Sequence, residues 1–133
     1  MFLLELGEIL AREEGKTLGE AKGEVFRAGQ FFQFYAAEAI RRTGEQNLST
    51  RPNIDIEIVR EPIGVTVLIT PWNFPIAIPA WKIAPALAHG NTVVLKPSEI
   101  TPTSAYYLTK IMEEAGLPAG VFNLLVARGE DVG

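Results

Sequence analysis

Residues 64–75 read GVTVLITPWNFP, a run of apolar and β-branched residues followed by a loop sequence. The first part is almost continuously apolar, which is typical of a strand buried on both faces of a parallel sheet. In the second part, prolines on either side of residues 72–74 fix the backbone of the loop. The stretch therefore predicts a buried strand that ends in a rigid loop.

Two later stretches have the pattern of further buried strands, and a helical pattern precedes each of them. Residues 91–95 read NTVVL and residues 121–126 read VFNLLV. Strands that alternate with helices at this spacing predict an α/β fold with a parallel sheet and right-handed crossovers. Ligands bind such sheets at the carboxyl ends of the strands. That rule selects the loops at residues 70–75 and 96–99 as the candidate site.

The helices between these strands carry boundary signals. The second helix is expected to begin after Thr101, a good N-cap residue, with Pro102 in its first position and Gly116 just past its end. The first helix is expected over residues 75–89. Pro85 lies inside this first helix and is expected to bend it or to break one of its backbone hydrogen bonds.

The N-terminal part of the chain is helical in pattern. Leucines repeat at helical spacing from residue 3 to residue 10, and a helix stop is expected at Gly15. A second helix is expected over residues 18–42. Because three phenylalanines, at positions 26, 31 and 34, fall outside its main apolar stripe, its apolar surface is unusually broad. This helix either packs on two sides, which we favour, or carries a ligand-binding aromatic face.

Between the helical part and the sheet, residues 44–53 form a polar connector and residues 54–58 (IDIEI) alternate strictly. Strict alternation predicts a half-buried strand whose edges need a partner. That partner is either another part of this domain or part of a larger assembly. The chain thus divides into a helical segment (1–45), a connector with an oligomerisation-type strand (46–62) and the α/β part (63–133).

The composition excludes several classes of protein. The chain has 133 residues and a net charge of -4, so it lacks the basic surface of a nucleic-acid-binding protein. No apolar run is long enough to span a membrane. The N-terminus lacks signal-peptide features, so a cytoplasmic protein is expected. There is no cysteine and one histidine, His89, which excludes disulfides, thiolate metal sites and a histidine metal site within one chain.

Each candidate loop carries polar side chains suited to chemistry. In the first loop, Asn73 lies between prolines, and a rigid amide N–H of this kind can stabilise an oxyanion. The other interpretation is that Asn73 only satisfies a tight turn. In the second loop, Lys96 and Glu99 either hydrogen-bond ribose hydroxyls or form an ordinary solvated turn. No Gly-x-Gly-x-x-Gly motif follows the first strand, so the usual dinucleotide fingerprint is absent.

Several motifs together resemble the aldehyde dehydrogenase superfamily over essentially the whole chain. They include TPWNFP at residues 70–75, AWKIAPALAHGNTVVLKPSE at 80–99 and EEAGLPAGVFN at 113–123. EGK at 14–16 with EA at 20–21 is similar to an N-terminal motif of the family, and EPIG at 61–64 is similar to the start of its first cofactor strand. The resemblance implies N-terminal helices followed by the first βαβαβ part of a Rossmann-like NAD(P)-binding domain.

The resemblance implies roles for individual residues. Asn73 matches the asparagine whose side-chain amide holds the substrate carbonyl oxygen as it becomes an oxyanion. Lys96 and Glu99, with Ser98 beside them, match the group that binds the adenosine ribose. Lys82 matches a lysine that supports the active-site network, its other interpretation being an ordinary solvated lysine. The stretches that line the cofactor and its pyrophosphate match Ile69, Thr70, Pro71, Trp72, Gly129 and Gly133.

One position departs from the family pattern. The third strand of the family leads into a Gly-x-Gly-x-x-x-Gly stretch, and Ala127 stands in place of its first glycine. The added methyl group is either accommodated or reshapes the approach of the phosphates. The family's nucleophilic cysteine and general base do not lie in this chain, so the isolated chain is expected to be inactive.

The implied activity is oxidation of an aldehyde to a carboxylic acid with NAD or NADP as cofactor. NAD is favoured, because the carboxylate of Glu99 should repel a 2′-phosphate. The run at residues 81–94 is most similar to the semialdehyde branch, such as 2-oxoglutarate semialdehyde enzymes. The strand near residues 54–59 implies a homo-oligomer of the full-length protein. The alternative is a non-catalytic nucleotide-binding or subunit-interaction module.

Overall fold

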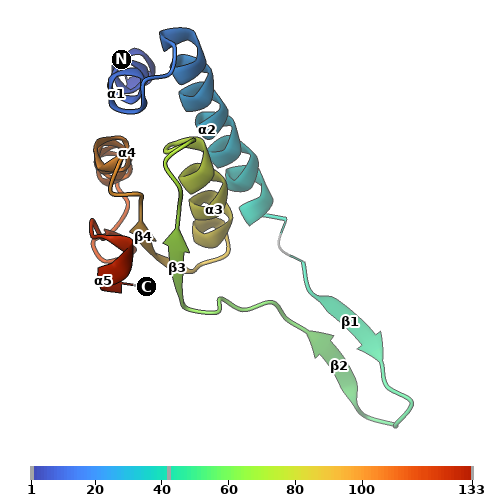
Figure 1. Ribbon diagram of the computed structural model, residues 1–133. Coiled ribbons are helices and arrows are strands. Elements are labelled where there is room, and N and C mark those ends of the chain that lie inside the picture. Colours follow the sequence, from blue (N-terminus) through green and yellow to red (C-terminus); the bar gives the residue numbers. More distant parts are fainter. Residues whose placement is uncertain (1, 42, 133) are drawn as a thin grey trace.

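The computed structural model describes residues 2–41 and 43–132 of the chain (Figure 1). Gly133, a predicted cofactor-binding residue, and Arg42, the predicted end of the second helix, lie outside the described residues. In chain order the elements are α1 (Phe2–Glu14), α2 (Leu18–Ala39), β1 (Glu45–Leu48), β2 (Asp55–Ile58), β3 (Val65–Ile69), α3 (Ala77–Ala88), β4 (Thr92–Lys96), α4 (Pro102–Glu114), β5 (Phe122–Leu124) and α5 (Gly129–Val132).

Strands β3, β4 and β5 form a parallel sheet in that order, which confirms the predicted α/β fold. In this register Val67 pairs with Val94, and Leu95 pairs with Leu124. Right-handed crossovers between consecutive neighbours place α3 and α4 on the same face of the sheet. Helix α2 packs on α3, and α1 packs on α2 and α4, so the N-terminal helices form an outer layer (Figure 1).

One hydrophobic cluster joins these layers. It contains Leu10 from α1, Ala28 from α2, Ile83 from α3, Leu95 from β4 and Leu108 from α4, all buried. Burial of each of the larger side chains, the leucines and the isoleucine, contributes roughly 1.5 to 3 kcal/mol to the free energy of folding. Because the N-terminal helices share this core with the sheet, their positions are fixed relative to the loops at the ends of β3 and β4.

The two faces of the sheet differ in burial. On the helix-covered face, Val93 and Leu95 are fully buried. On the opposite face, Val65, Val67 and Ile69 of β3 expose 69%, 64% and 64% of their surface. The prediction that this first strand is buried on both faces is therefore wrong for this chain, because both crossover helices lie on one side and no described element covers the other.

The region between α2 and β3 forms a hairpin. Its first strand, β1, lies within the residues that the sequence predicted to be a polar connector, and it pairs antiparallel with β2. Both strands are exposed on both faces, so the prediction of a half-buried strand is also wrong. Leu48 is 94% exposed near the tip. The hairpin projects away from the rest of the chain (Figure 1). Pairing between β1 and β2 satisfies the backbone hydrogen bonds along one edge of each strand and leaves the other edge open.

The helix boundaries agree closely with the sequence signals. Gly15 follows α1 with a φ of 89°, a left-handed conformation that favours glycine. Helix α2 contacts α1 and α3, as expected for a helix packed on two sides. Helix α3 continues through Pro85 to Ala88, although proline has no N–H to donate to the preceding turn. Among the described residues, no helix is long and apolar enough to cross a membrane.

Candidate functional site

The two candidate loops lie side by side at the carboxyl edge of the sheet. Ile69 and Lys96 are partners at the ends of β3 and β4. Just beyond them, the amide of Thr70 donates to the carbonyl oxygen of Lys96 at 3.1 Å. The parallel register therefore brings together the start of TPWNFP and the start of KPSE, as the sequence predicted.

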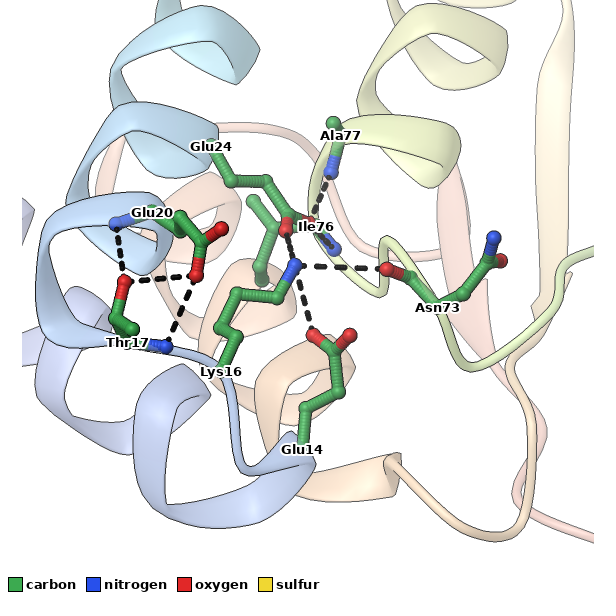
Figure 2. A network of polar contacts seen from close by, with 8 residues as sticks. All are labelled: Glu14, Lys16, Thr17, Glu20, Glu24, Asn73, Ile76 and Ala77. Carbon is green, nitrogen blue, oxygen red and sulfur yellow. Dashed lines mark hydrogen bonds and ion pairs between the residues drawn. The ribbon is translucent and has the colours of Figure 1, made fainter.

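The first loop is anchored on one side and open on the other. Pro75 and Ile76 are buried, whereas Asn73 and Trp72 are exposed. The hydroxyl of Thr70 is buried and has no hydrogen-bond partner among the described residues. The side chain of Asn73 points away from the polar contacts that hold its backbone (Figure 2). The loop thus exposes the side-chain amide of Asn73 next to a buried, well-packed segment.

A glutamate from α2 holds the start of α3. The Oε1 atom of Glu24 accepts hydrogen bonds from the amides of Ile76 at 2.9 Å and Ala77 at 3.0 Å (Figure 2). Amides in the first turn of a helix have no acceptor within the helix, and Ile76, the N-cap residue, offers no side-chain hydrogen bond. The carboxylate also suits the positive end of the helix dipole. Glu24 therefore caps α3 from a distant part of the sequence.

Lys16 connects this cap to the loop. Its ammonium group forms an ion pair with Glu24 and another with Glu14 at 2.8 Å. It also donates to the carbonyl oxygen of Asn73 at 3.4 Å and lies 4.5 Å from the centre of the Phe74 ring. Burial acts to lower the pKa of Lys16, but hydrogen bonds and charge attraction from Glu14 and Glu24 outweigh it and raise that pKa. The ammonium of Lys16 is therefore charged in the folded protein at neutral pH.

The second loop is held mainly by its own residues. The ammonium of Lys96, which is buried, lies 3.1 Å from a carboxylate oxygen of Glu99. The hydroxyl of Ser98 accepts a hydrogen bond from the amide of Ile100 at 3.3 Å. The Glu99 backbone amide and Lys96 together hold the pKa of the Glu99 carboxyl below its usual range. The structure thus places the predicted pair together, with the carboxylate at the surface.

Helix α4 begins at the predicted residue but is capped differently. Thr101 stands at the N-cap, yet its side chain forms no capping hydrogen bond and its hydroxyl has no partner among the described residues. Instead, Glu13 at the end of α1 accepts from the amides of Thr103 at 2.6 Å and Ser104 at 2.8 Å. The expectation that Thr101 caps this helix is wrong, because a carboxylate from α1 takes both amides.

Sequence reasoning missed the structural roles of Glu13, Lys16 and Glu24. Glu13 and Lys16 lie in or beside the EGK motif at residues 14–16, which was matched by resemblance without a mechanism. No local pattern marks Glu24 as a cap, since its acceptor contacts span 52 and 53 residues. The one sign in the sequence is that Glu24 lies on the same face of α2 as the buried Ala21 and Ala28, where a charged residue is unexpected.

The remaining predicted residues lie around the loops. Lys82 is exposed on α3, and the hydrogen bonds and ion pairs of Lys16 and Glu24 are made with other described residues. Gly129 begins the short helix α5, and a methyl group added there would meet open space. The described residues contain no group of three or more His, Cys, Asp or Glu side chains that would hold a metal ion.

Comparison with known proteins places this arrangement in a family. A model described as the aldehyde dehydrogenase family matches residues 3–133. Alpha-ketoglutarate semialdehyde dehydrogenase of Haloferax volcanii is 50% identical over 129 residues, which are 97% of this chain and 27% of that protein. Succinate-semialdehyde dehydrogenase (NADP⁺) 1 of Schizosaccharomyces pombe is 45% identical over 123 residues, 92% of this chain and 25% of that protein.

A solved structure extends the likeness to the fold. Betaine aldehyde dehydrogenase from Staphylococcus aureus, crystallised in complex with NAD⁺, is 40% identical and gives a TM-score of 0.94 over 97% of this chain and 26% of its own. The chain therefore spans about a quarter of the length of the relatives that it matches. With its motifs, its parallel sheet and its paired loops matched together, the chain belongs to the aldehyde dehydrogenase family.

Proposed function

We propose that this chain is the part of an NAD(P)-dependent aldehyde dehydrogenase that holds the adenosine ribose of the cofactor and the oxyanion donor. One observation carries the proposal: the loops after β3 and β4 lie side by side, with Asn73 on one and the Lys96–Glu99 pair on the other. In open parallel sheets this edge is where nucleotides bind.

The residues present fit the ribose of a nucleotide. The ammonium of Lys96 can donate to one hydroxyl and the carboxylate of Glu99 can accept from another, and the two are already 3.1 Å apart. The first loop then supplies the lining through Ile69, Thr70, Pro71 and Trp72, and Ser98 holds the second loop in shape. We also propose that Gly129 and Gly133 border the pyrophosphate, where Gly129 leaves space for a close approach.

The start of α3 does not serve as a phosphate site. In the usual dinucleotide fold, the pyrophosphate lies at the N-terminus of the helix after the first strand. Here the carboxylate of Glu24 occupies those amides, and a second negative group would be repelled. The absence of the glycine fingerprint after β3 agrees with this.

In the proposed reaction, the side-chain amide of Asn73 donates a hydrogen bond to the aldehyde oxygen as negative charge develops there. The bound nicotinamide supplies the hydride acceptor. A cysteine nucleophile and a base complete the reaction in the scheme implied by the family, and this chain has no cysteine. We therefore propose that the chain by itself is inactive, and that Lys82 supports the site only when the rest of the enzyme is present.

The cofactor we favour is NAD. Glu99 is 50% exposed at its side chain and its lowered pKa keeps it ionised, so it repels a 2′-phosphate on the ribose. A relative whose name specifies NADP⁺ lies within the same family, so the two cofactors need a direct comparison. We propose a semialdehyde as the substrate class, on the basis of the 50% identical Haloferax volcanii relative.

The proposal is tested by calorimetric titration of the chain with NAD⁺ and NADP⁺. We expect NAD⁺ to bind, Lys96→Met to weaken it, and NADP⁺ to bind more weakly. The catalytic role of Asn73 needs a chimera in which this chain replaces the matching segment of the Haloferax volcanii enzyme. There, Asn73→Ala should lower kcat by about 10² to 10³. No effect of Lys96→Met on binding, or full activity of the Asn73 variant, would contradict the assignment.

The exposed hairpin favours a second function that is compatible with the first. Its apolar side chains, such as Leu48 at 94% exposed and Ile58 at 48%, and its open strand edges suit pairing with another subunit. We propose that this arm contributes to a homo-oligomer. Co-purification of the chain with a complete subunit, lost on replacing Ile56 and Ile58 by serine, would support this role.

A further inference from the structure

We propose that Lys16 and Glu24 are positioning residues that fix the segment 73–77 and so set the direction of the side-chain amide of Asn73. The inference rests on the proposed function only for what Asn73 does there. The fixing itself is a property of this chain and is tested on the chain alone.

The two residues hold the segment at both ends. At the far end, one oxygen of Glu24 accepts from the amides of Ile76 and Ala77. At the near end, Lys16 donates to the carbonyl oxygen of Asn73 and lies over the ring of Phe74. The other oxygen of Glu24 forms an ion pair with Lys16 (Figure 2). One ion pair therefore joins the backbone on either side of Phe74-Pro75.

The near end controls where the Asn73 side chain points. Its backbone carbonyl is directed toward Lys16, whereas its side-chain amide is directed away from the network (Figure 2). Without the contact to Lys16, the backbone at Asn73 is free to shift, and a shift of its Cα atom would re-aim the side-chain amide. A displacement of about 1 Å at a reacting group can cost about 10²-fold in rate, so the lysine acts on the reaction without touching the substrate.

Burial makes these contacts difficult to replace by water. The side chains of Lys16 and Glu24 are 12% and 2% exposed. Glu14, at 10% exposed, supplies the second carboxylate, and the amides at the start of α3 supply partial positive charge. Lys16 is the cation that both carboxylates share, and removing its ammonium leaves two buried carboxylates close together without a cation between them.

The first experiment uses the whole chain and follows amide hydrogen exchange by NMR. First-turn amides have no acceptor within their helix, so protection of Ile76 and Ala77 reports directly on Glu24. We expect Lys16→Met to speed their exchange by about tenfold or more and to shift the side-chain amide resonances of Asn73. Lys16→Arg should restore both, and Lys110→Met, an exposed lysine in a pair on α4, should change neither.

The structural part fails if Lys16→Met leaves the exchange of Ile76 and Ala77 and the Asn73 resonances as in the unchanged chain. If Lys16→Met does not fold, Glu24→Gln takes its place, because it keeps an acceptor for the amides and removes only the ion pair. The same two readouts then decide, and unchanged values again overturn the inference.

The second experiment measures the effect on the reaction in the chimera with the Haloferax volcanii enzyme. Per active site, Lys16→Met should lower kcat about ten- to a hundredfold and leave KM for NAD⁺ unchanged, because Lys96 and Glu99 are untouched. A merely structural role would reduce the active fraction but not kcat per site, and that result overturns the inference. If the unsubstituted chimera forms no NADH with any aldehyde, the proposed function fails, while the exchange experiment still decides the fixing of the loop.

Discussion

The two loops at the edge of the sheet are held in different ways. The KPSE loop is held mainly by contacts within itself, such as Lys96 to Glu99 at three residues' separation. The TPWNFP loop is held by residues more than fifty positions away, namely Lys16 and Glu24. Both helices that follow are capped by glutamates of the N-terminal helices, Glu13 for α4 and Glu24 for α3.

This difference agrees with the roles that we propose for the two loops. A pair that binds a ribose works as long as its two side chains are near each other, and a short loop provides that locally. An oxyanion donor, the role proposed for Asn73, has to point in one direction, and loop residues alone set direction poorly. The N-terminal segment does more than cover the core, since it supplies the buried charges that contact the first loop.

The largest expected effect is that of Glu24→Leu on stability. The substitution leaves the amides of Ile76 and Ala77 without an acceptor and removes a partner of Lys16. Breaking a buried ion pair on one side costs about 3 to 5 kcal/mol, so the free energy of unfolding in urea should fall by that amount. Glu38→Leu near the end of the same helix should leave the unfolding midpoint almost unchanged, and equal effects of the two would refute the buried cap.

Lys16 should show a smaller effect that depends on pH. Although burial opposes it, Glu14 and Glu24 raise the pKa of Lys16 in the folded chain above the ordinary lysine value of 10.5. The folded state then binds the proton more tightly than the unfolded state. The stabilisation is complete below that ordinary value and is lost as pH rises through the folded pKa.

Urea unfolding from pH 8 to pH 12 measures this directly. The free energy of unfolding of the unchanged chain should exceed that of Lys16→Met at pH 8, and the gap should narrow above pH 10.5. Taking the difference between the two chains removes the titration of the other lysines and of the tyrosines. A gap that stays constant up to pH 12 would mean that the charge of Lys16 does not stabilise the loop.

Glu13→Ala should have the next smaller effect. It removes the acceptor of the Thr103 and Ser104 amides at the start of α4, and loss of a helix cap costs about 1 to 2 kcal/mol. Thermal unfolding of Glu13→Ala beside Glu8→Ala, an exposed glutamate of the same helix, isolates the cap from helix propensity. If Thr101 takes over as the cap, the two variants will unfold alike.

The contrast between the loops also explains how much of the site the sequence predicted. The pair Lys96 and Glu99 and the edge position of Asn73 follow from strand ends and short spacings, and the structure pairs Lys96 with Glu99 and places the two loops side by side. Glu13 and Glu24 act across 52 to 91 residues, and no periodicity encodes such a contact. Thr101 was predicted as a cap from a local preference that a tertiary contact overrides.

The same limit applies to the sheet. Parallel strands, crossover helices and helix ends follow from local patterns and were predicted. The apolar pattern of β3 predicted burial on both faces, but Val65, Val67 and Ile69 are exposed. Apolar residues at those positions show only that this face of the strand can be buried. Whether it is buried depends on elements outside the strand.

The smallest effect on stability, and the sharpest test of the second loop, is that of Glu99→Gln. Because this carboxylate lies at the surface, we expect the unfolding midpoint to stay unchanged, while the affinity for NAD⁺ falls about tenfold, the change that one charge-assisted hydrogen bond provides. Its backbone amide and Lys96 lower the pKa of Glu99. Calorimetry should therefore show that NAD⁺ affinity falls on acidification as the carboxylate takes up its proton, with the midpoint of the fall below the ordinary glutamate value of 4.5. If Glu99→Gln binds NAD⁺ as tightly as the unchanged chain while Lys96→Met binds it more weakly, then only the lysine contacts the ribose. The ion pair between Lys96 and Glu99 would then have no part in binding.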